Sequence, residues 1–222
     1  MFISEDEKIM GLGDRVQGQG RENTGLRIIE KAAGCTNFEK VACGKYTRFI
    51  LTKAGQLFCS GLNKHNALGF KAPALVKSFT RVTENFPVEN HDKIVDVASG
   101  DNFTLIATRN GKVYGAGQQF YTKASLGTGD GDAKNRPYEL TLPQDYRALK
   151  VFCAQHQPIG FVLAEQGQGG SKSVLSIGID SCLLGEDNKE IDKSKKFHFV
   201  TLPAGLYFND IQCAGENAWA ID

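Results

Sequence analysis

The sequence lacks the features that mark several large classes of protein. No apolar run approaches the ~18 residues of a membrane-spanning helix. The N-terminus, MFISEDEK, is acidic and short, unlike a secretory signal or an Arg-rich transit peptide. None of the six cysteines forms a C-x-x-C pair, so a zinc site has little support. We therefore expect reduced thiols in a cytosolic or nuclear protein that has no membrane partner.

The chain also has little net charge. Its 26 Lys and Arg residues almost balance 25 Asp and Glu residues, which leaves a formal charge of +1. This balance provides no basic field for nucleic acid and no acidic field for a cationic substrate. The short basic run KSKK, from Lys193 to Lys196, is better explained as a solvated loop than as a DNA contact. We expect no nucleic-acid partner.

Glycine, by contrast, is abundant and recurs along the chain, with 25 glycines against six prolines. Three segments align, namely Lys40 to Gly69, Val95 to Gly127 and Lys150 to Gly185. Each has a strand-like start that ends in small residues, an alternating apolar strand and a glycine-bearing turn. A strand ending in small-x-Gly and a final Leu-Gly follow. The Leu-Gly glycines are spaced by 58 residues in both intervals, which identifies a repeat.

The local signals within a unit favour β-strands. The segment 103–108 alternates as a half-buried antiparallel strand does, with Phe103, Leu105 and Ala107 on one face and Thr104, Ile106 and Thr108 on the other. The pair Asn110-Gly111 that follows is typical of a tight hairpin turn. Strand-built units of about 55 residues are typical of propeller blades. A glycine lets the converging backbones approach closely. We predict an all-β propeller with these structural repeat glycines: Gly13, Gly20, Gly44, Gly61, Gly69, Gly100, Gly117, Gly127, Gly178, Gly185 and Gly215.

The two ends of the chain supply the fourth unit. The stretch KIMGLGDRVQGQG (8–20) matches the second half of a repeat, and DIQCAGENAWAID (210–222) matches the first half. We therefore predict one propeller-like domain over 1–222, partial or small, with a blade shared between the termini. Its units are approximately 21–69, 70–127, 128–185, and 186–222 completed by 1–20. A self-closed ring, a head-to-tail pair of copies and a piece of a longer propeller all fit this pattern.

These motifs resemble the repeats of the regulator of chromosome condensation family. VACGKYTRFILTKAGQLFCSGLNKHNALG matches best and VASGDNFTLIATRNGKVYGAG second. The position of the family tryptophan is occupied here by Ser60, Ala116 and Ile177. The position of the family histidine is occupied by Tyr46, Phe103 and Gln157. The resemblance implies a β-propeller, usually seven-bladed, that binds proteins without catalysing a reaction. Such a module serves as a scaffold or assembly subunit in the cytoplasm, or in a chromatin, cytoskeletal or ciliary assembly.

The resemblance also implies a second function, guanine-nucleotide exchange on a small GTPase, which is the activity of the family's founding member. In this hypothesis a loop is inserted into the GTPase as a wedge that displaces the nucleotide, and the candidate loop runs from Lys71 to Asp92. A third hypothesis is a hydrolase or lyase that uses Asp130, Asp132 and His156. The two aspartates lack the later ligands and the terminal glutamate of a calcium loop, so a polar inter-blade loop is favoured.

The remaining candidate motifs are weak. Val16 replaces the third glycine of a dinucleotide fingerprint, and Ser171 interrupts the Gly-Lys-Ser order of a Walker loop, so GQGGSKS (167–173) is predicted to be an enlarged hairpin turn. We predict no catalytic, cofactor-binding or metal-ligating residue. The histidines lie in different units: His65, His91, His156 and His198. We expect core positions for Trp219 and for three thiols at equivalent strand ends: Cys43, Cys153 and Cys213.

Overall fold

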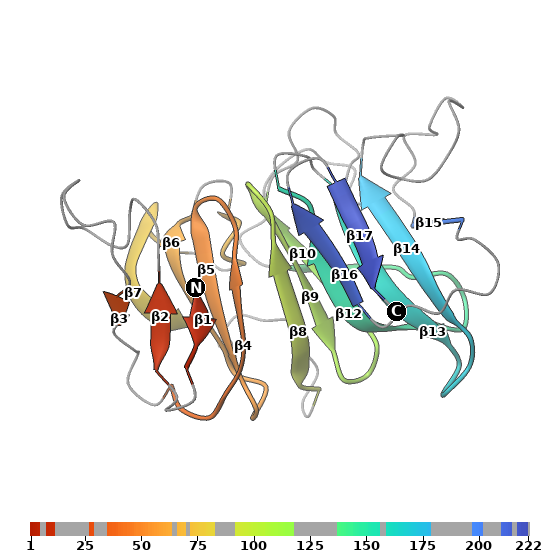
Figure 1. The fold of residues 1–222 in the computed structure, drawn as a ribbon, viewed down its shortest axis with the longest axis horizontal. Helices are drawn as coiled ribbons and strands as arrows, with labels where there is room; N and C mark the ends of the chain where they lie inside the picture. The colour runs from red at the N-terminus through yellow and green to blue at the C-terminus, as the bar shows by residue number, and fades with distance from the viewer. Residues whose placement is uncertain are drawn as a thin grey trace.

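The computed structural model of the chain is built from β-strands (Figure 1). It describes residues 1–4, 8–11, 27–28, 35–63, 66–69, 72–82, 92–117, 137–155, 159–178, 197–201, 210–214 and 217–221. In this part of the chain no helix has the length and apolar character needed to cross a membrane. The strands form five separate antiparallel sheets, and in each sheet every strand pairs with the next strand along the chain.

Three of the sheets are complete four-stranded blades. The first contains β4 (Phe38–Cys43), β5 (Thr47–Thr52), β6 (Leu57–Leu62) and β7 (Leu75–Arg81). The second contains β8 (Ile94–Ser99), β9 (Phe103–Thr108), β10 (Val113–Gly117) and β11 (Tyr138–Leu140). The third contains β12 (Tyr146–Cys153), β13 (Ile159–Gln166), β14 (Lys172–Gly178) and β15 (His198–Phe199). Repeated up-and-down sheets of this kind confirm the predicted β-propeller class.

The predicted pairing of the chain ends is wrong for the strands that the structure describes. The first sheet contains β1 (Phe2–Ile3), β2 (Ile9–Gly11) and β3 (Arg27–Ile28), and the last contains β16 (Asp210–Ala214) and β17 (Asn217–Ile221). These are separate sheets, and no described strand of the β1–β3 sheet pairs with β16 or β17. The blade expected to be shared between the termini is therefore two partial blades.

The physical reason is competition for one edge of β2. In the complete blade β4–β7, Leu51 of β5 pairs with Leu57 of β6. The repeat alignment puts Ile9 in the place of Leu57 and Ile221 in the place of Leu51. However, the residue that pairs with Ile9 is Ile3 of β1. Because β1 already occupies this edge, the edge is closed to β17.

The sheets stack face to face in sequence order (Figure 1). Strand β1 packs against β4, β8 packs against β4 and β5, β12 packs against β8 and β9, and β16 packs against β12. The first strands of successive blades, β4, β8, β12 and β16, are therefore neighbours. Figure 1 shows the N-terminal sheet beside β4–β7 and the C-terminal sheet beside the blade that contains β12.

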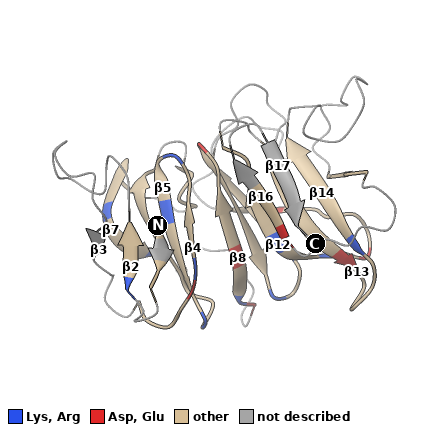
Figure 2. Ribbon diagram, in the orientation of Figure 1, with Lys and Arg blue, Asp and Glu red and all other residues tan. Residues whose placement is uncertain are grey.

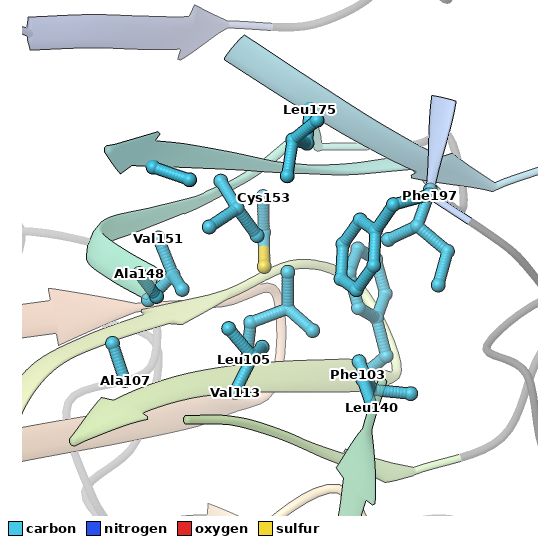
Figure 3. Close-up of a cluster of buried hydrophobic side chains, with 13 residues drawn as sticks. Phe103, Leu105, Ala107, Val113, Leu140, Ala148, Val151, Cys153, Leu175 and Phe197 are labelled. Carbon is cyan, nitrogen blue, oxygen red and sulfur yellow. The ribbon is translucent and has the colours of Figure 1, made fainter. Parts of the chain in front are cut away.

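The core lies between the stacked sheets. Side chains of β9 and β12 project toward one another in a cluster that includes Phe103, Leu105, Val151 and Cys153 (Figure 3). Ile106 of β9 belongs to a second cluster, which also contains Phe49 of β5 and Leu57 of β6. The alternation of β9 is therefore real, but both of its faces are buried rather than one, because blades cover both sides of the sheet.

Candidate functional site

Two glycines at the ends of third strands lie where a side chain has no room. Gly61 ends the run of small residues in β6 with φ of +123°, and Gly117 ends β10 with φ of +104°. A Cβ atom would lie 2.1 Å from the Tyr46 carbonyl oxygen at Gly61, and 2.2 Å from the Asn102 carbonyl oxygen at Gly117. Both carbonyls belong to the turn between the first and second strands of the same blade. These positions therefore hold the turn tightly against the third strand.

The other predicted repeat glycines divide into two groups. Gly44 and Gly100 follow β4 and β8 directly, and Gly178 ends β14, while Gly69 lies in the turn before β7. The remaining five lie outside the described residues: Gly13, Gly20, Gly127, Gly185 and Gly215. A structural role for the whole set remains a prediction, as do the repeat boundaries.

Charged residues occupy one position in the first strand of every blade from β4 onward. The repeat register aligns Lys40, Asp96, Lys150 and Asp210, so the sign of the charge alternates. Lys40 forms an ion pair with Asp96, and Lys150 Nζ lies 3.4 Å from Asp210 Oδ1. The Asp96 side chain also accepts the Val151 backbone N–H at 2.9 Å, so it joins three consecutive blades. This alternation was not among the sequence-based predictions, although the register of the repeats contained it.

A chain of hydroxyl groups crosses the interface between the first two complete blades. Thr47 Oγ1 and Ser99 Oγ lie 2.8 Å apart, and Ser99 Oγ lies 2.9 Å from Thr104 Oγ1. Thr104 then donates to the Ala67 carbonyl oxygen at 2.8 Å. The chain ends on a backbone carbonyl and includes no histidine or carboxylate, so it serves packing rather than nucleophilic chemistry.

The structure does not assemble the catalytic candidates of the sequence into a site within the described ranges. The first five residues of GQGGSKS, 167–171, connect β13 to β14, and the last two begin β14. Gln166 N–H donates to the Ser171 carbonyl oxygen across this connection, as predicted for an enlarged turn. His198 lies on β15. The other candidates lie outside the described residues: Asp130, Asp132, His65, His91 and His156. No grouping of three or more potential metal ligands occurs in the part of the chain that is described.

The three cysteines at equivalent strand ends do not share one environment. Cys153 is buried as predicted, but Cys43 is exposed, so its predicted buried position is wrong. Cys43 is the last residue of β4, whereas Ser99 occupies the equivalent position in the next blade and is buried there. For Cys213 and Trp219 the structure describes only the backbone, in β16 and β17, so their core positions remain predictions.

These environments predict which thiols react. In the native protein we expect iodoacetamide to modify Cys43 and to spare Cys35, Cys59 and Cys153, which are buried. Burial also raises the pKa of the Cys59 thiol, which keeps it in the unreactive protonated form. Peptide mapping by mass spectrometry measures each site separately, and unfolded protein is the positive control. Equal labelling rates for Cys43 and Cys59 in the native protein would contradict this prediction.

The described surface has one concentration of exposed apolar side chains. Tyr46, Leu62 and Leu75, each 38% to 48% exposed, belong to the β4–β7 blade. Leu62 and Leu75 are cross-strand partners, and the Leu62 N–H donates to the Tyr46 carbonyl oxygen at 2.9 Å. We call these three residues the apolar cluster. Exposed apolar groups gathered at one end of a blade are a feature of protein-binding surfaces.

A charged pair flanks the apolar cluster. Lys45 Nζ lies 3.2 Å from Asp101 Oδ2 of the next blade and 5.4 Å from the centre of the Tyr46 ring. The hydrogen bond to Asp101 raises the pKa of Lys45. The arrangement can bind an apolar side chain beside a fixed charge, which suits recognition of another protein better than chemical catalysis.

Comparison with known proteins gives the same fold. The family model for the regulator of chromosome condensation (RCC1) repeat matches residues 94–121, which include β8, β9 and β10. The crystal structure of human WBSCR16 superimposes with a TM-score of 0.69 at 17% identity, over 94% of this chain and 52% of that one. Prp20p from Saccharomyces cerevisiae gives a TM-score of 0.69 at 18% identity, over 99% and 52%. At these identities the likeness concerns the fold alone.

Two curated relatives match at the sequence level. The regulator of chromosome condensation of Xenopus laevis is 27% identical over 46% of this chain and 24% of its own length. The human probable E3 ubiquitin-protein ligase HERC4 is 26% identical over 82% of this chain and 16% of its own length. The chain thus spans about half of the solved chains and a quarter or less of these relatives. The repeated sheets and the superimposed propellers identify a β-propeller fold, and the matched repeat and the curated relatives show that this chain is similar to proteins of the regulator of chromosome condensation repeat family.

Proposed function

We propose that this chain is a non-catalytic protein-interaction module that acts as a scaffold or assembly subunit. The observation that carries the proposal is the apolar cluster, which is exposed at one end of a rigid blade and flanked by a fixed ion pair. A stacked set of sheets supports such a surface, because buried side chains join each complete blade to its neighbours. The family relatives support protein partners, since the structure of Prp20p was reported with its binding to Gsp1p and histones.

The alternative is guanine-nucleotide exchange on a small GTPase. Sequence similarity supports it through the regulator of chromosome condensation and the X-linked retinitis pigmentosa GTPase regulator of dog, which is 27% identical over 64% of this chain. The candidate wedge, residues 71 to 92, is not an open loop throughout, because residues 75–81 form the paired strand β7, while 83–91 lie outside the described residues. We therefore favour the interaction module, with a small GTPase or a chromatin, cytoskeletal or ciliary assembly as the partner classes and cytoplasm or nucleus as the location.

Affinity purification of the tagged full chain under quantitative conditions tests the proposal. We expect a partner retained in fixed stoichiometry by the wild type and depleted about tenfold when Tyr46, Leu62 and Leu75 are all replaced by serine. A tyrosine is a frequent anchor of protein interfaces, and the two leucines would bury apolar surface against the partner. Phe199→Ser is the matched control, because Phe199 is equally exposed on another blade.

Two results would contradict the proposal. One is the absence of any stoichiometric partner for the wild-type chain. The other is acceleration of nucleotide release when the chain is added to a panel of small GTPases loaded with labelled GDP, which would establish exchange instead.

A further inference from the structure

The charges of the chain are distributed unevenly. Residues 40–83 contain no Asp or Glu, although about five would be expected in a stretch of this length at the average frequency of the chain. The same stretch contains eight basic residues: Lys40, Lys45, Arg48, Lys53, Lys64, Lys71, Lys77 and Arg81. It covers the β4–β7 blade except for its first two residues, Phe38 and Glu39, so Glu39 is the one acidic residue in the strands of this blade. The near-zero charge of the whole chain therefore conceals one strongly basic blade.

Only part of this charge is neutralised by neighbouring groups. Lys40 and Lys45 are paired with Asp96 and Asp101 of the next blade. Four other cations of the blade have no ion pair with a described residue: Arg48, Lys53, Lys77 and Arg81. Arg48 Nη1 is buried and has no hydrogen-bond partner in the described part of the structure. The blade thus carries positive charge that the described chain leaves uncompensated.

The basic and apolar features meet on the outer strand of the blade. Strand β7 begins at Leu75, a member of the apolar cluster, and continues through Lys77 to Arg81, with both cations exposed. It is the outermost strand of its sheet, and its second edge pairs with no described strand. With seven residues, β7 is also longer than β11 and β15, the equivalent strands of the other blades. Figure 2 shows the Lys and Arg positions on β5 and β7.

We propose that β7 and the apolar cluster together bind an acidic polypeptide segment that contains apolar side chains. An extended segment lying along β7 would place carboxylates near Lys77 and Arg81 and a leucine-like side chain on Leu62 and Leu75, in the manner of strand addition to a sheet edge. This inference rests on the proposed function and names the chemical class of its partner.

The observations favour an acidic polypeptide over two other occupants. A second copy of the chain would bring an equally basic blade to the same edge, and exposed lysines on edge strands oppose pairing of identical sheets. A nucleic acid would satisfy the cations but not Leu62 and Leu75, and only Tyr46 offers an aromatic ring for base stacking in this cluster. An acidic segment with apolar side chains complements both features.

Fluorescence anisotropy with the full chain tests this inference. The probe is a fluorescein-labelled peptide in which pairs of glutamates alternate with single leucines. We expect it to bind the wild type and to lose affinity about tenfold in the double variant Lys77→Glu, Arg81→Glu, because two charge contacts become repulsive. Leu75→Ser should weaken binding several-fold, and added salt should weaken binding to the wild type.

The matched control is the double variant Arg109→Glu, Lys172→Glu, which makes the same change in net charge at exposed positions on other blades. It should bind the probe as the wild type does. The inference is overturned by an equal loss in this control, by no binding of the probe, or by binding of a single-stranded oligonucleotide in preference to the peptide.

The same variants separate this inference from the proposed function. If the stoichiometric partner stays bound when Lys77 and Arg81 are both glutamate, the interaction module stands and the acidic-segment surface fails. If the wild-type chain retains no partner, the proposed function fails instead.

Discussion

Gly61→Ala is expected to lower the free energy of unfolding by about 3 kcal/mol or more. The new methyl group would lie 2.1 Å from the Tyr46 carbonyl oxygen, and the backbone at φ of +123° is one that alanine rarely adopts. The obstacle is backbone rather than a side chain, so it cannot rotate away. Relief requires the turn around Tyr46 to move off the end of β6. Urea denaturation followed by circular dichroism measures the change.

The matched control for this prediction is Gly169→Ala. Gly169 also has a positive φ, +74°, but no heavy atom outside its chain neighbours lies within 4 Å of the added Cβ. Only the conformational preference of alanine then opposes the substitution, which should cost about 1 kcal/mol. Similar losses at the two positions would show that the close approach at Gly61 does not constrain the blade.

Asp96→Ala is expected to lower the free energy of unfolding by about 3 kcal/mol. Asp96 is 5% exposed, and its carboxylate binds both Lys40 and the Val151 N–H, on the two adjacent blades. Its removal leaves a buried N–H without this acceptor and an ammonium group without its counterion. The loss is largest where both partners are desolvated, and the partial exposure of Lys40 keeps the expected loss below that of a fully buried pair.

Asp210→Ala tests whether the stability that Asp96 contributes comes from its burial or from its position in the repeat. Asp210 occupies the same position in its own blade and pairs with Lys150, but both side chains are more than 40% exposed. An exposed pair contributes about 1 kcal/mol or less. Equal destabilisation by the two substitutions, measured by the same denaturation experiment, would contradict the bridging role of Asp96.

The features that the sequence predicted well are local or repeated. The hairpin at Asn110-Gly111 forms because its residues favour the turn without help from the rest of the chain, and Gly111 has a positive φ. The strand alternation of Phe103 and Leu105 was visible for the same reason. The register of the repeats then aligned the three complete blades, which is why the fold class could be predicted.

The features that the sequence did not predict depend on competition between distant segments. Strand β1 contains only Phe2 and Ile3, too few residues for a recognisable strand pattern, yet it occupies the edge assigned to β17. The exposure of Cys43 likewise depends on the neighbouring blade rather than on β4. The candidate surface was missed for another reason. The net charge of +1 is a sum over all 222 residues, so it does not reveal that a group of basic residues lies within one blade.

The stacking of successive sheets also affects the free-energy cost of opening each sheet locally. β8–β11 is enclosed by described blades on both sides, with β4 and β5 packed against β8 and with β12 packed against β8 and β9. Local opening of this sheet therefore breaks contacts with two neighbours at once, which makes it costly. The apolar cluster and β7 belong to an inner blade that β1–β3 and β8–β11 flank. A binding partner there meets a surface on a blade that contacts neighbouring sheets on both of its sides.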